Sequence, residues 1–309
     1  MPMWAWILFY ALVIVMLYAD LKLFGRKGQH EVSISEALKM TAVWIIVSLI
    51  FCGGIWFYEG DNKAMEFLAG YLIEKSLSMD NLFVFLMLFS FFGVQRKYQH
   101  EVLFWGIFGA LILRSIFIFA GAAMVQRFEW ILGIFGVFLI YTGIKMFNHQ
   151  EESVDPSKNI FVKLFKKFFP VTDQMHEDKF FIVEQGKRLA TPLFIALLVI
   201  ETTDVAFAVD SIPAVFSVSR DPFIVLTSNI FAILGLRALY FALAAIAQYF
   251  AYLKYGLGII LSFVGVKMLL EVLWDINIPT PISLLIIFGV LVLSMLASYV
   301  ATLYSRKRQ

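Results

Sequence analysis

Charge and cysteine are both scarce in this chain of 309 residues. Only 16% of the residues are charged and 61% are hydrophobic, whereas about a quarter are charged in soluble globular proteins. The single cysteine, Cys52, lies in an apolar run, which excludes a disulfide framework and a thiolate metal cluster within this sequence. The composition is that of a membrane protein with several spans.

Histidine is scarce as well, and its placement matters more than its number. All four histidines fall between the apolar runs, at His30, His100, His149 and His176. No imidazole is therefore expected at membrane depth. A metal site inside the membrane would be built mostly from oxygen ligands.

Apolar runs that approach the roughly 20 residues needed to cross a bilayer occur nine times. They cover residues 3–23, 38–58, 67–92, 102–125, 130–147, 189–218, 223–247, 253–273 and 282–304. Three of the later runs begin with a capping side chain and a proline, at Thr191-Pro192, Asp221-Pro222 and Thr280-Pro281, which is a signal for the start of a helix. We expect an all-α polytopic protein with one transmembrane domain over residues 1–309.

The distribution of basic residues predicts the orientation. If the amino terminus is outside, eighteen lysines and arginines fall on the inner connections and only Lys63, Arg127 and Arg220 on the outer ones. Positive charge accumulates on the cytoplasmic side of membrane proteins. We therefore expect the topology N-out, C-in.

One long polar connection, residues 148–188, is then cytoplasmic. Its simplest interpretation is a solvated linker in which Lys163, Lys166 and Lys167 face lipid headgroups. The alternative is a metal site, for which the connection offers Asp173, His176, Glu177 and Asp178.

Five carboxylates lie inside the apolar runs, where an unpaired charge is costly. They form two clusters, EKSLSMDN at residues 74–81 and ETTDVAFAVDSIP at residues 201–213. The five acids are Glu74, Asp80, Glu201, Asp204 and Asp210. A bound cation would offset these charges together, so we expect a metal site built from these side chains.

Three landmarks of the third to fifth runs recur in the same order in the sixth to eighth. They are the acidic pairs Glu74-x5-Asp80 and Asp204-x5-Asp210, the arginines Arg114 and Arg237, and the endings Gly136-x6-Gly143-Ile-Lys145-Met and Gly258-x6-Gly265-Val-Lys267-Met. Because each copy has three spans, the second is inserted in the opposite sense, as in many secondary transporters. We expect an inverted 3+3 repeat over residues 66–147 and 189–273, with two leading helices and one trailing helix.

The spacing within each acidic pair poses a geometric problem, because side chains six residues apart do not share a face of an ideal helix. The acids can converge only if a helix is kinked or unwound. Pro213 removes the hydrogen bond to the carbonyl of Val209, beside Asp210. We therefore expect a break in the second acidic helix. The first acidic run contains no proline, which leaves its continuity open.

The ligand types favour a hard cation. Carboxylates, carbonyls and hydroxyls suit Mg²⁺, Ca²⁺ or Mn²⁺, and the lack of cysteine and histidine disfavours Zn²⁺ and Cu⁺. The Met79 thioether would favour Mn²⁺ over Ca²⁺, although such a methionine more often serves packing. The secondary ligands expected near the acids are Met79, Asn81, Thr202, Val209 and Ser211.

Four basic residues within the spans are the expected charge partners of the acids. They are Lys75, Arg114, Arg237 and Lys267. In an alternative interpretation these residues form purely structural bridges with the acids. Arg114 and Arg237 fit a structural role better than that of substrate ligands.

The segments EKSLSMDNLFVF (74–85) and ETTDVAFAVDSIPAVF (201–216), with the two G-[IV]-K-M endings, resemble the TerC/Alx family of bacterial membrane proteins. The resemblance extends from residue 3 to residue 304. The family is associated with tellurite resistance and with manganese export, and it is grouped with LysE-like transporters built on inverted three-helix repeats. The resemblance implies that the five acids handle the metal and that the protein lies in the bacterial inner membrane.

Together these observations predict a secondary transporter that exports Mn²⁺ by alternating access, with protons as a candidate counter-ion. Two alternatives stay open: a transporter of another hard cation such as Ca²⁺, and a membrane sensor or partner that supplies metal to exported proteins. An enzyme is not expected, because the Gly-x-Gly-Asp signature of intramembrane aspartyl proteases is absent. No prosthetic group and no nucleic-acid partner are expected, and the oligomeric state is left open.

Overall fold

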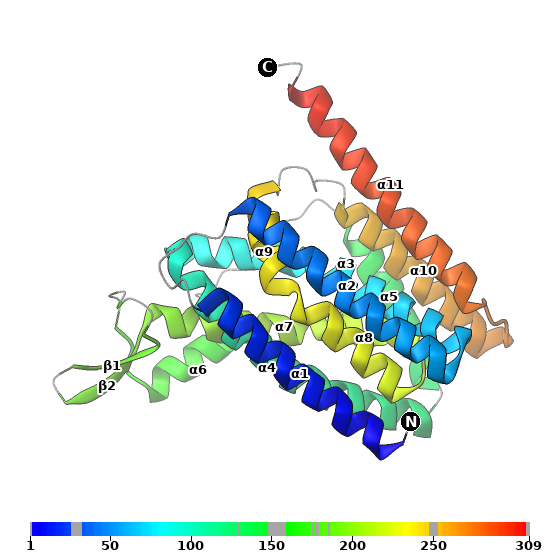
Figure 1. Cartoon of the computed structure of the whole chain (residues 1–309), viewed down its shortest axis with the longest axis horizontal. Coiled ribbons are helices and arrows are strands. Elements are labelled where there is room, and N and C mark those ends of the chain that lie inside the picture. The colour runs from blue at the N-terminus through cyan, green and yellow to red at the C-terminus, as the bar shows by residue number, and fades with distance from the viewer. Residues whose placement is uncertain are drawn as a thin grey trace.

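The computed structural model describes residues 2–25, 33–128, 130–147, 159–172, 174, 176, 179–184, 186–246 and 253–306. Within these ranges, the side chains at positions 23–25, 80, 245–246 and 302–306 are not described. The described chain forms helices and one β-hairpin (Figure 1). Their bounds are α1 Met3–Gly25, α2 Ile34–Glu59, α3 Asp61–Phe91, α4 Arg96–Arg127, α5 Trp130–Lys145, α6 Ile160–Phe168, β1 Phe181–Glu184, β2 Lys187–Ala190, α7 Pro192–Phe216, α8 Pro222–Leu234, α9 Leu236–Ile246, α10 Leu253–Trp274 and α11 Thr280–Arg306.

Six helices are long and apolar enough to cross a membrane: α1, α2, α4, α7, α10 and α11. Helices α8 and α9 pass the same test together but are bent by 42°, which gives seven spans if the bent pair counts as one. These elements coincide with seven of the runs expected from the sequence. They confirm an all-helical membrane protein with several spans.

Helices α3 and α5 occupy the places of the third and fifth expected spans, but they do not pass that test. The 16 residues of α5 give about 24 Å of helix, less than the hydrocarbon core of about 30 Å. The 31 residues of α3 are long enough, but charged side chains recur along it. These are Asp61, Lys63, Glu66, Glu74, Lys75 and Asp80. The count of nine spans therefore stays a prediction.

The centre of the molecule is formed by α3, α4, α7 and α8 (Figure 1). Helix α3 packs against α7 and α8, and α4 packs against the same two helices. A cluster of rings attaches the leading helices to this centre. The ring centroid of Phe231 on α8 lies 4.5 Å from that of Phe51 on α2 and 6.2 Å from that of Phe9 on α1. The helices that carry the two acidic motifs are thus neighbours in the core.

Helices α5 and α10 approach each other at two pairs of glycines. A Cβ atom added to Gly136 would lie 2.9 Å from the carbonyl oxygen of Gly265, and one added to Gly258 would lie 2.8 Å from that of Gly143. Both separations are shorter than Cβ contacts in real proteins. The pairs occur in reverse order along the two helices, so α5 and α10 run antiparallel. Only glycine permits their backbones to come so close.

The helix that is interrupted is not the expected one. Helix α7 is continuous to Phe216, and Pro213 lies in its last turn, where the loss of one hydrogen bond does not end a helix. The expected break beside Asp210 is therefore wrong, and α3 is continuous as well. The seventh expected span is instead divided at Gly235, where α8 gives way to α9.

Lys75 of α3 explains why this interruption is tolerated. Its Nζ donates to the carbonyl oxygen of Ala232 at 3.1 Å, in the last turn of α8. The carbonyl groups that end a helix lack intrahelical donors and carry partial negative charge, so an ammonium group there stabilises the end. A Cβ atom on Gly235 would lie 2.9 Å from this Nζ, which favours glycine at the bend.

The described part of the connection over residues 148–188, expected to be a solvated and partly amphipathic linker, includes regular structure. It contains α6 and the antiparallel hairpin β1–β2. Phe165 of α6 and Phe181 of β1 both pack on Phe194 of α7, with ring centroids 5.0 and 4.6 Å apart. His176 Nδ1 lies 2.9 Å from the carbonyl oxygen of Gln174. The other metal ligands considered there, Asp173, Glu177 and Asp178, lie outside the described residues.

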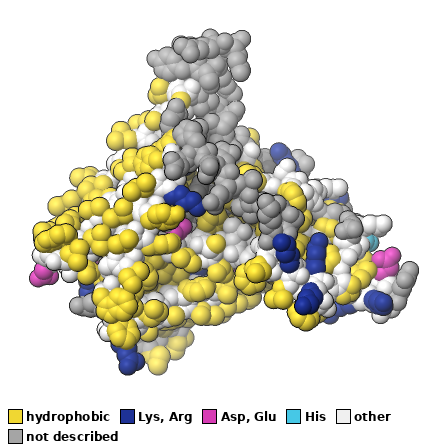
Figure 2. Space-filling model, turned by 180° about the vertical axis from the view of Figure 1, so that it is seen from behind, with side chains coloured by type: hydrophobic (Ala, Val, Ile, Leu, Met, Phe, Trp, Pro, Cys, Tyr) yellow, Lys and Arg dark blue, Asp and Glu magenta, His cyan; other side chains and the backbone are white. Residues whose placement is uncertain are grey.

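The surface of the helical body is rich in apolar side chains (Figure 2). Large residues such as Ile7, Phe57 and Leu285 are more than half exposed. Lys and Arg side chains gather toward the end that carries α6 and the hairpin (Figure 2). An apolar surface of this extent requires lipid around it.

Candidate functional site

An arginine on α4 joins the two acidic motifs. Arg114 is completely buried and pairs with Glu74 on α3 and Asp204 on α7. Its Nε and Nη2 donate to the two carboxylate oxygens of Asp204 at 3.1 and 2.8 Å, and its Nη1 donates to Oε1 of Glu74. The planar guanidinium therefore binds Asp204 in the two-pronged geometry that is the strongest form of such a pair.

Glu74 accepts further hydrogen bonds that complete its shell. Ser78 Oγ donates to Oε1 at 3.0 Å, and Asn229 Nδ2 on α8 donates to Oε2 at 2.8 Å. The Asn229 side-chain oxygen in turn accepts from Nη1 of Arg114 at 3.3 Å. Arg114, Glu74 and Asn229 thus form a closed ring of hydrogen bonds, which holds all three side chains in one arrangement.

Glu201 stands beside this network, one helical turn before Asp204. Its Oε2 is buried and has no hydrogen-bond partner among the described residues. The carboxylate lies against Gly109 of α4, where a Cβ atom would overlap it. Glycine at position 109 therefore leaves room for an acid that is placed to receive a cation or a proton.

The charges around Arg114 do not cancel. Three carboxylates lie here, those of Glu74, Asp204 and Glu201. The positive charges among the described residues are the guanidinium of Arg114 and the ammonium group of Lys75, which acts electrostatically on Glu74. With all these groups ionised the set carries a formal charge of −1. Because charge is costly in surroundings of low dielectric constant, a proton or a cation would neutralise this set favourably.

Asp210 points away from the network, toward α5. Its Oδ1 accepts a hydrogen bond from Thr142 Oγ1 at 3.2 Å, and Lys145 acts on it electrostatically. This divergence from Asp204 follows from their six-residue spacing on an uninterrupted helix.

The five predicted metal ligands are therefore only partly accounted for. Asp80 lies on α3, but its side chain is outside the described part of the structure. No group of three or more His, Cys, Asp or Glu side chains suited to a metal occurs among the described residues. Convergence of all five carboxylates on one ion stays a prediction.

Among the expected secondary ligands, Ser211 reaches the network, with its Oγ 3.5 Å from Nη1 of Arg114. Thr202 is held elsewhere: it donates to the carbonyl of Val199 at 3.0 Å and accepts from Asn159 at 2.9 Å. Of the remaining three, Met79 is partly buried, Asn81 is buried and Val209 is exposed.

The two repeat-related arginines have different partners. Arg237 pairs with Asp20 of α1: its Nη2 lies 2.7 Å from Oδ2 and donates to the backbone carbonyl at 2.6 Å. Lys267 is buried and is influenced electrostatically by Glu66 and Glu271. The arrangement of charges is therefore asymmetric although the sequence landmarks recur.

Sequence reasoning missed several partners of the charged side chains within the spans. Asp20 could have been found, because it is an acid inside the first apolar run like the five that were named. Thr142 and Asn229 carry no charge, and nothing in the pattern of the sequence distinguishes them from the many hydroxyl and amide side chains of the spans.

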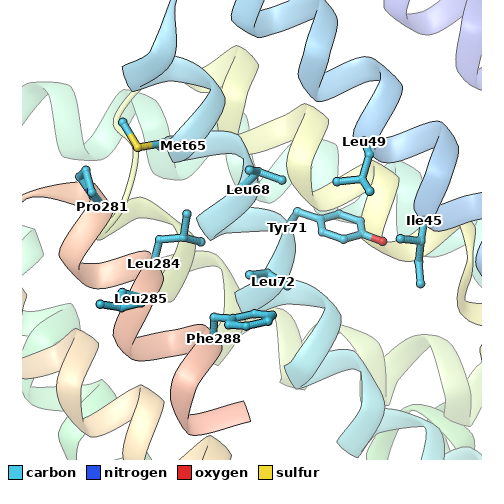
Figure 3. A pocket seen from close by; sticks show the side chains of 10 residues that line it. All are labelled: Ile45, Leu49, Met65, Leu68, Tyr71, Leu72, Pro281, Leu284, Leu285 and Phe288. Carbon is cyan, nitrogen blue, oxygen red and sulfur yellow. The ribbon is translucent and has the colours of Figure 1, made fainter. Parts of the chain in front are cut away.

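A large groove elsewhere is unsuited to a cation. It has a volume of about 470 Å³, lies between α2, α3 and α11, and is lined by apolar side chains such as Leu49, Leu72 and Phe288 (Figure 3). Tyr71 brings the only hydroxyl among its lining residues, and this group points toward Ile45 of α2 (Figure 3). With no carboxylate in its wall, the groove offers no ligand set for a hard ion.

A much smaller cavity adjoins Asp204. It measures about 20 Å³, enough for about one water molecule. Its other walls are apolar, including Leu82, Ile107 and Leu236. On this side Asp204 therefore faces mostly apolar side chains.

These features define a class: an integral membrane protein whose core holds a charged network between packed helices. The model of the family described as "Integral membrane protein TerC family" matches residues 59–308. The chain therefore belongs to this family. The family resemblance seen in the sequence is thereby confirmed.

Three relatives illustrate the similarity. The chain is 48% identical over 295 residues to an uncharacterized membrane protein, STKORF319, of Myxococcus xanthus, covering 96% of this chain and 92% of the relative. It is 47% identical over 297 residues to Alx of Escherichia coli strain K12, which is named as a proposed membrane-bound redox modulator. This match covers 93% of this chain and 92% of Alx. It is 40% identical over 296 residues to a membrane protein of Rickettsia bellii, covering 96% and 97%. No solved structure matches the chain.

Proposed function

We propose that this protein is a secondary transporter that exports Mn²⁺ from the cytoplasm through a carboxylate site near the membrane midplane. The observation that carries the proposal is the joining of Glu74 and Asp204, one from each acidic motif, through the buried Arg114. The unpaired oxygen of Glu201 beside this network supplies a place where a cation would be favoured.

The packing of the helices supports an inverted repeat. Helix α3 packs against α8 as α7 packs against α4, and α5 packs against its counterpart α10. The glycine contacts are reciprocal: Gly136 meets Gly265, and Gly143 meets Gly258. Two copies related by a two-fold axis would produce this pattern. Movement of one copy against the other would expose the acids to each side of the membrane in turn.

We extend the proposal to nine spans with the amino terminus outside and the carboxyl terminus in the cytoplasm of a bacterial inner membrane. In this arrangement α3 and α5 cross the membrane within the bundle, where neighbouring helices cover the charges of α3. Lys163, Lys166 and Lys167 of α6 then lie on the cytoplasmic side, as the excess of positive charge there requires.

The choice of ion rests on chemistry and on the family. Carboxylate, hydroxyl and amide oxygens surround the network, which suits a hard divalent cation. Manganese, in preference to calcium or magnesium, comes from what is associated with the TerC family. The name of the Alx relatives suggests a redox role for them. This sequence has one cysteine, buried Cys52, and therefore cannot form a disulfide within itself.

Transport by the purified protein tests the proposal. We expect proteoliposomes to move Mn²⁺, and we expect Asp80→Asn, Glu201→Gln and Asp210→Asn to lose most of this flux, while Glu184→Gln on the exposed hairpin retains it. Comparing flux with and without a pH gradient would test protons as the counter-ion. If the purified protein binds Mn²⁺ but moves none, a sensor or metal-supplying partner is the better explanation. Wild-type flux in all three acid variants would refute the site.

A further inference from the structure

We propose that Arg114 is a tethered cation that occupies the place of the transported ion between Glu74 and Asp204 whenever the site is empty. This inference rests on the proposed transport function and assigns a specific step to one residue. In this role Arg114 permits the unloaded protein to return to its starting state. Binding of a divalent cation to the two carboxylates and pairing of Arg114 with them exclude each other.

The position of the guanidinium is the first support for this role. It lies between carboxylates that come from different helices, α3 and α7, and it contacts both at once. The side chains of Glu74 and Arg114 have no exposed surface, and that of Asp204 is 7% exposed. Such a position leaves no room for an ion while the arginine is in place.

Charge is the second support. If Arg114 withdrew and no ion entered, Glu74 and Asp204 would face each other as unscreened anions, with Glu201 as a third beside them. A divalent cation in place of the guanidinium would bring more positive charge to the same oxygens. The acids are therefore stabilised in two states, with arginine or with ion, and the state with neither is disfavoured.

The hydrogen bonds around the guanidinium show how it is held ready. Asn229 binds Glu74 with its amide nitrogen at 2.8 Å and accepts from Arg114 at 3.3 Å with its oxygen. When the arginine leaves, Asn229 can therefore still hold Glu74 in position. The corresponding arginine of the second repeat, Arg237, pairs with Asp20 of α1, which lies outside both repeats.

Two transport assays separate this role from a structural one. Net efflux of Mn²⁺ into ion-free medium requires the empty protein to return, whereas exchange of labelled for unlabelled Mn²⁺ does not. We expect Arg114→Gln to reduce net efflux by about tenfold or more, because its empty site has no internal cation. Exchange should continue, with half-saturation at a lower Mn²⁺ concentration.

Two further variants complete the test. Arg114→Lys should recover part of the net efflux, because lysine keeps the charge but lacks the planar fork. Arg220→Gln removes an arginine whose exposed pair with Glu271 at 2.7 Å lies outside the network, and it should leave both assays unchanged. If Arg114→Gln cannot be purified in folded form, the uncharged variant Arg114→Met takes its place, and a ratio of net efflux to exchange equal to that of wild type in that variant would overturn the proposal.

The outcomes for the two proposals are distinct. A wild-type protein that moves Mn²⁺ in neither assay refutes the transport function and this inference with it. A wild-type protein active in both assays, combined with equal losses of exchange and net efflux in folded Arg114→Gln, refutes the tethered cation and leaves the transport function intact.

Discussion

Neighbouring acids on α7 have very different surroundings. Asp204 receives two hydrogen bonds from Arg114, at 3.1 and 2.8 Å, whereas Glu201 Oε2 is buried with no partner in the described part of the chain. A satisfied buried ion pair contributes to one defined arrangement, while an unsatisfied buried carboxylate opposes folding. The same motif therefore contains one acid held by an ion pair and one acid with a buried oxygen that no described residue satisfies.

This contrast leads to a prediction for two isosteric substitutions. Asp204→Asn should lower the free energy of unfolding by about 3–5 kcal/mol, because it leaves the buried Arg114 with one carboxylate partner, Glu74, in place of two. Glu201→Gln should leave stability unchanged or raise it, because it removes the charge of a carboxylate whose buried Oε2 has no hydrogen-bond partner in the described part of the chain. Thermal unfolding of both variants in detergent measures the difference. Equal destabilisation by both changes would contradict the surroundings described for Glu201.

The sequence revealed the charged residues of the site better than their contacts. Glu74, Asp204 and Arg114 stood out because charge inside an apolar run is rare. The recurrence of the two arginines pointed to equivalent roles. In the structure Arg114 pairs with both acids and Arg237 pairs with Asp20, which depends on which helices pack together. The neutral members, Asn229 above all, have no equivalent signal.

At the scale of elements, the glycine pairs fix how closely α5 and α10 approach. Gly143 lies against Gly258 and Ser262 of the facing helix, and its hypothetical Cβ would lie 2.6 Å from the Gly258 carbonyl oxygen. Gly133, on the same helix, is different: a Cβ atom there would meet its nearest neighbour, Val272, at an ordinary 3.5 Å. Gly143 and Gly133 therefore provide a matched pair of positions on α5.

We expect Gly143→Ala to destabilise the protein by about 1–3 kcal/mol, since the facing backbone cannot yield without separating the helices. Gly133→Ala should be neutral or slightly stabilising, because alanine favours the helix and has room. Unfolding in denaturant, followed by circular dichroism of the purified protein, measures both changes. A neutral Gly143→Ala would show that the close approach of α5 and α10 is incorrect.

Helix boundaries were predicted less well than helix existence. The sequence located a helix at each apolar run, but it placed the interruption at Pro213, where the helix continues, and missed the one at Gly235. Proline is a strong local signal, yet its effect is small in a last turn. The bend at Gly235 depends on Lys75, which is 157 positions from Ala232 in the sequence, and no local pattern reports such a contact.

At the scale of the whole molecule, the orientation in the membrane is the most accessible prediction. Lys63 near the start of α3 is expected outside, and Lys166 of α6 is expected in the cytoplasm. In right-side-out vesicles, an impermeant maleimide should label Lys63→Cys at once and Lys166→Cys only after the membrane is opened. Cys52 is buried and should add little background. Labelling of Lys166→Cys in sealed vesicles would reverse the topology.

Glu74 and Lys75 are adjacent in the chain but act on different helices. Glu74 ties α3 to Arg114, and Lys75 ties α3 to the end of α8 at Ala232. Because consecutive side chains of a helix differ in direction by about 100°, a turn of α3 about its own axis displaces both contacts together. The ion pair with Arg114 and the carboxyl-terminal end of α8 are therefore mechanically linked through one continuous helix.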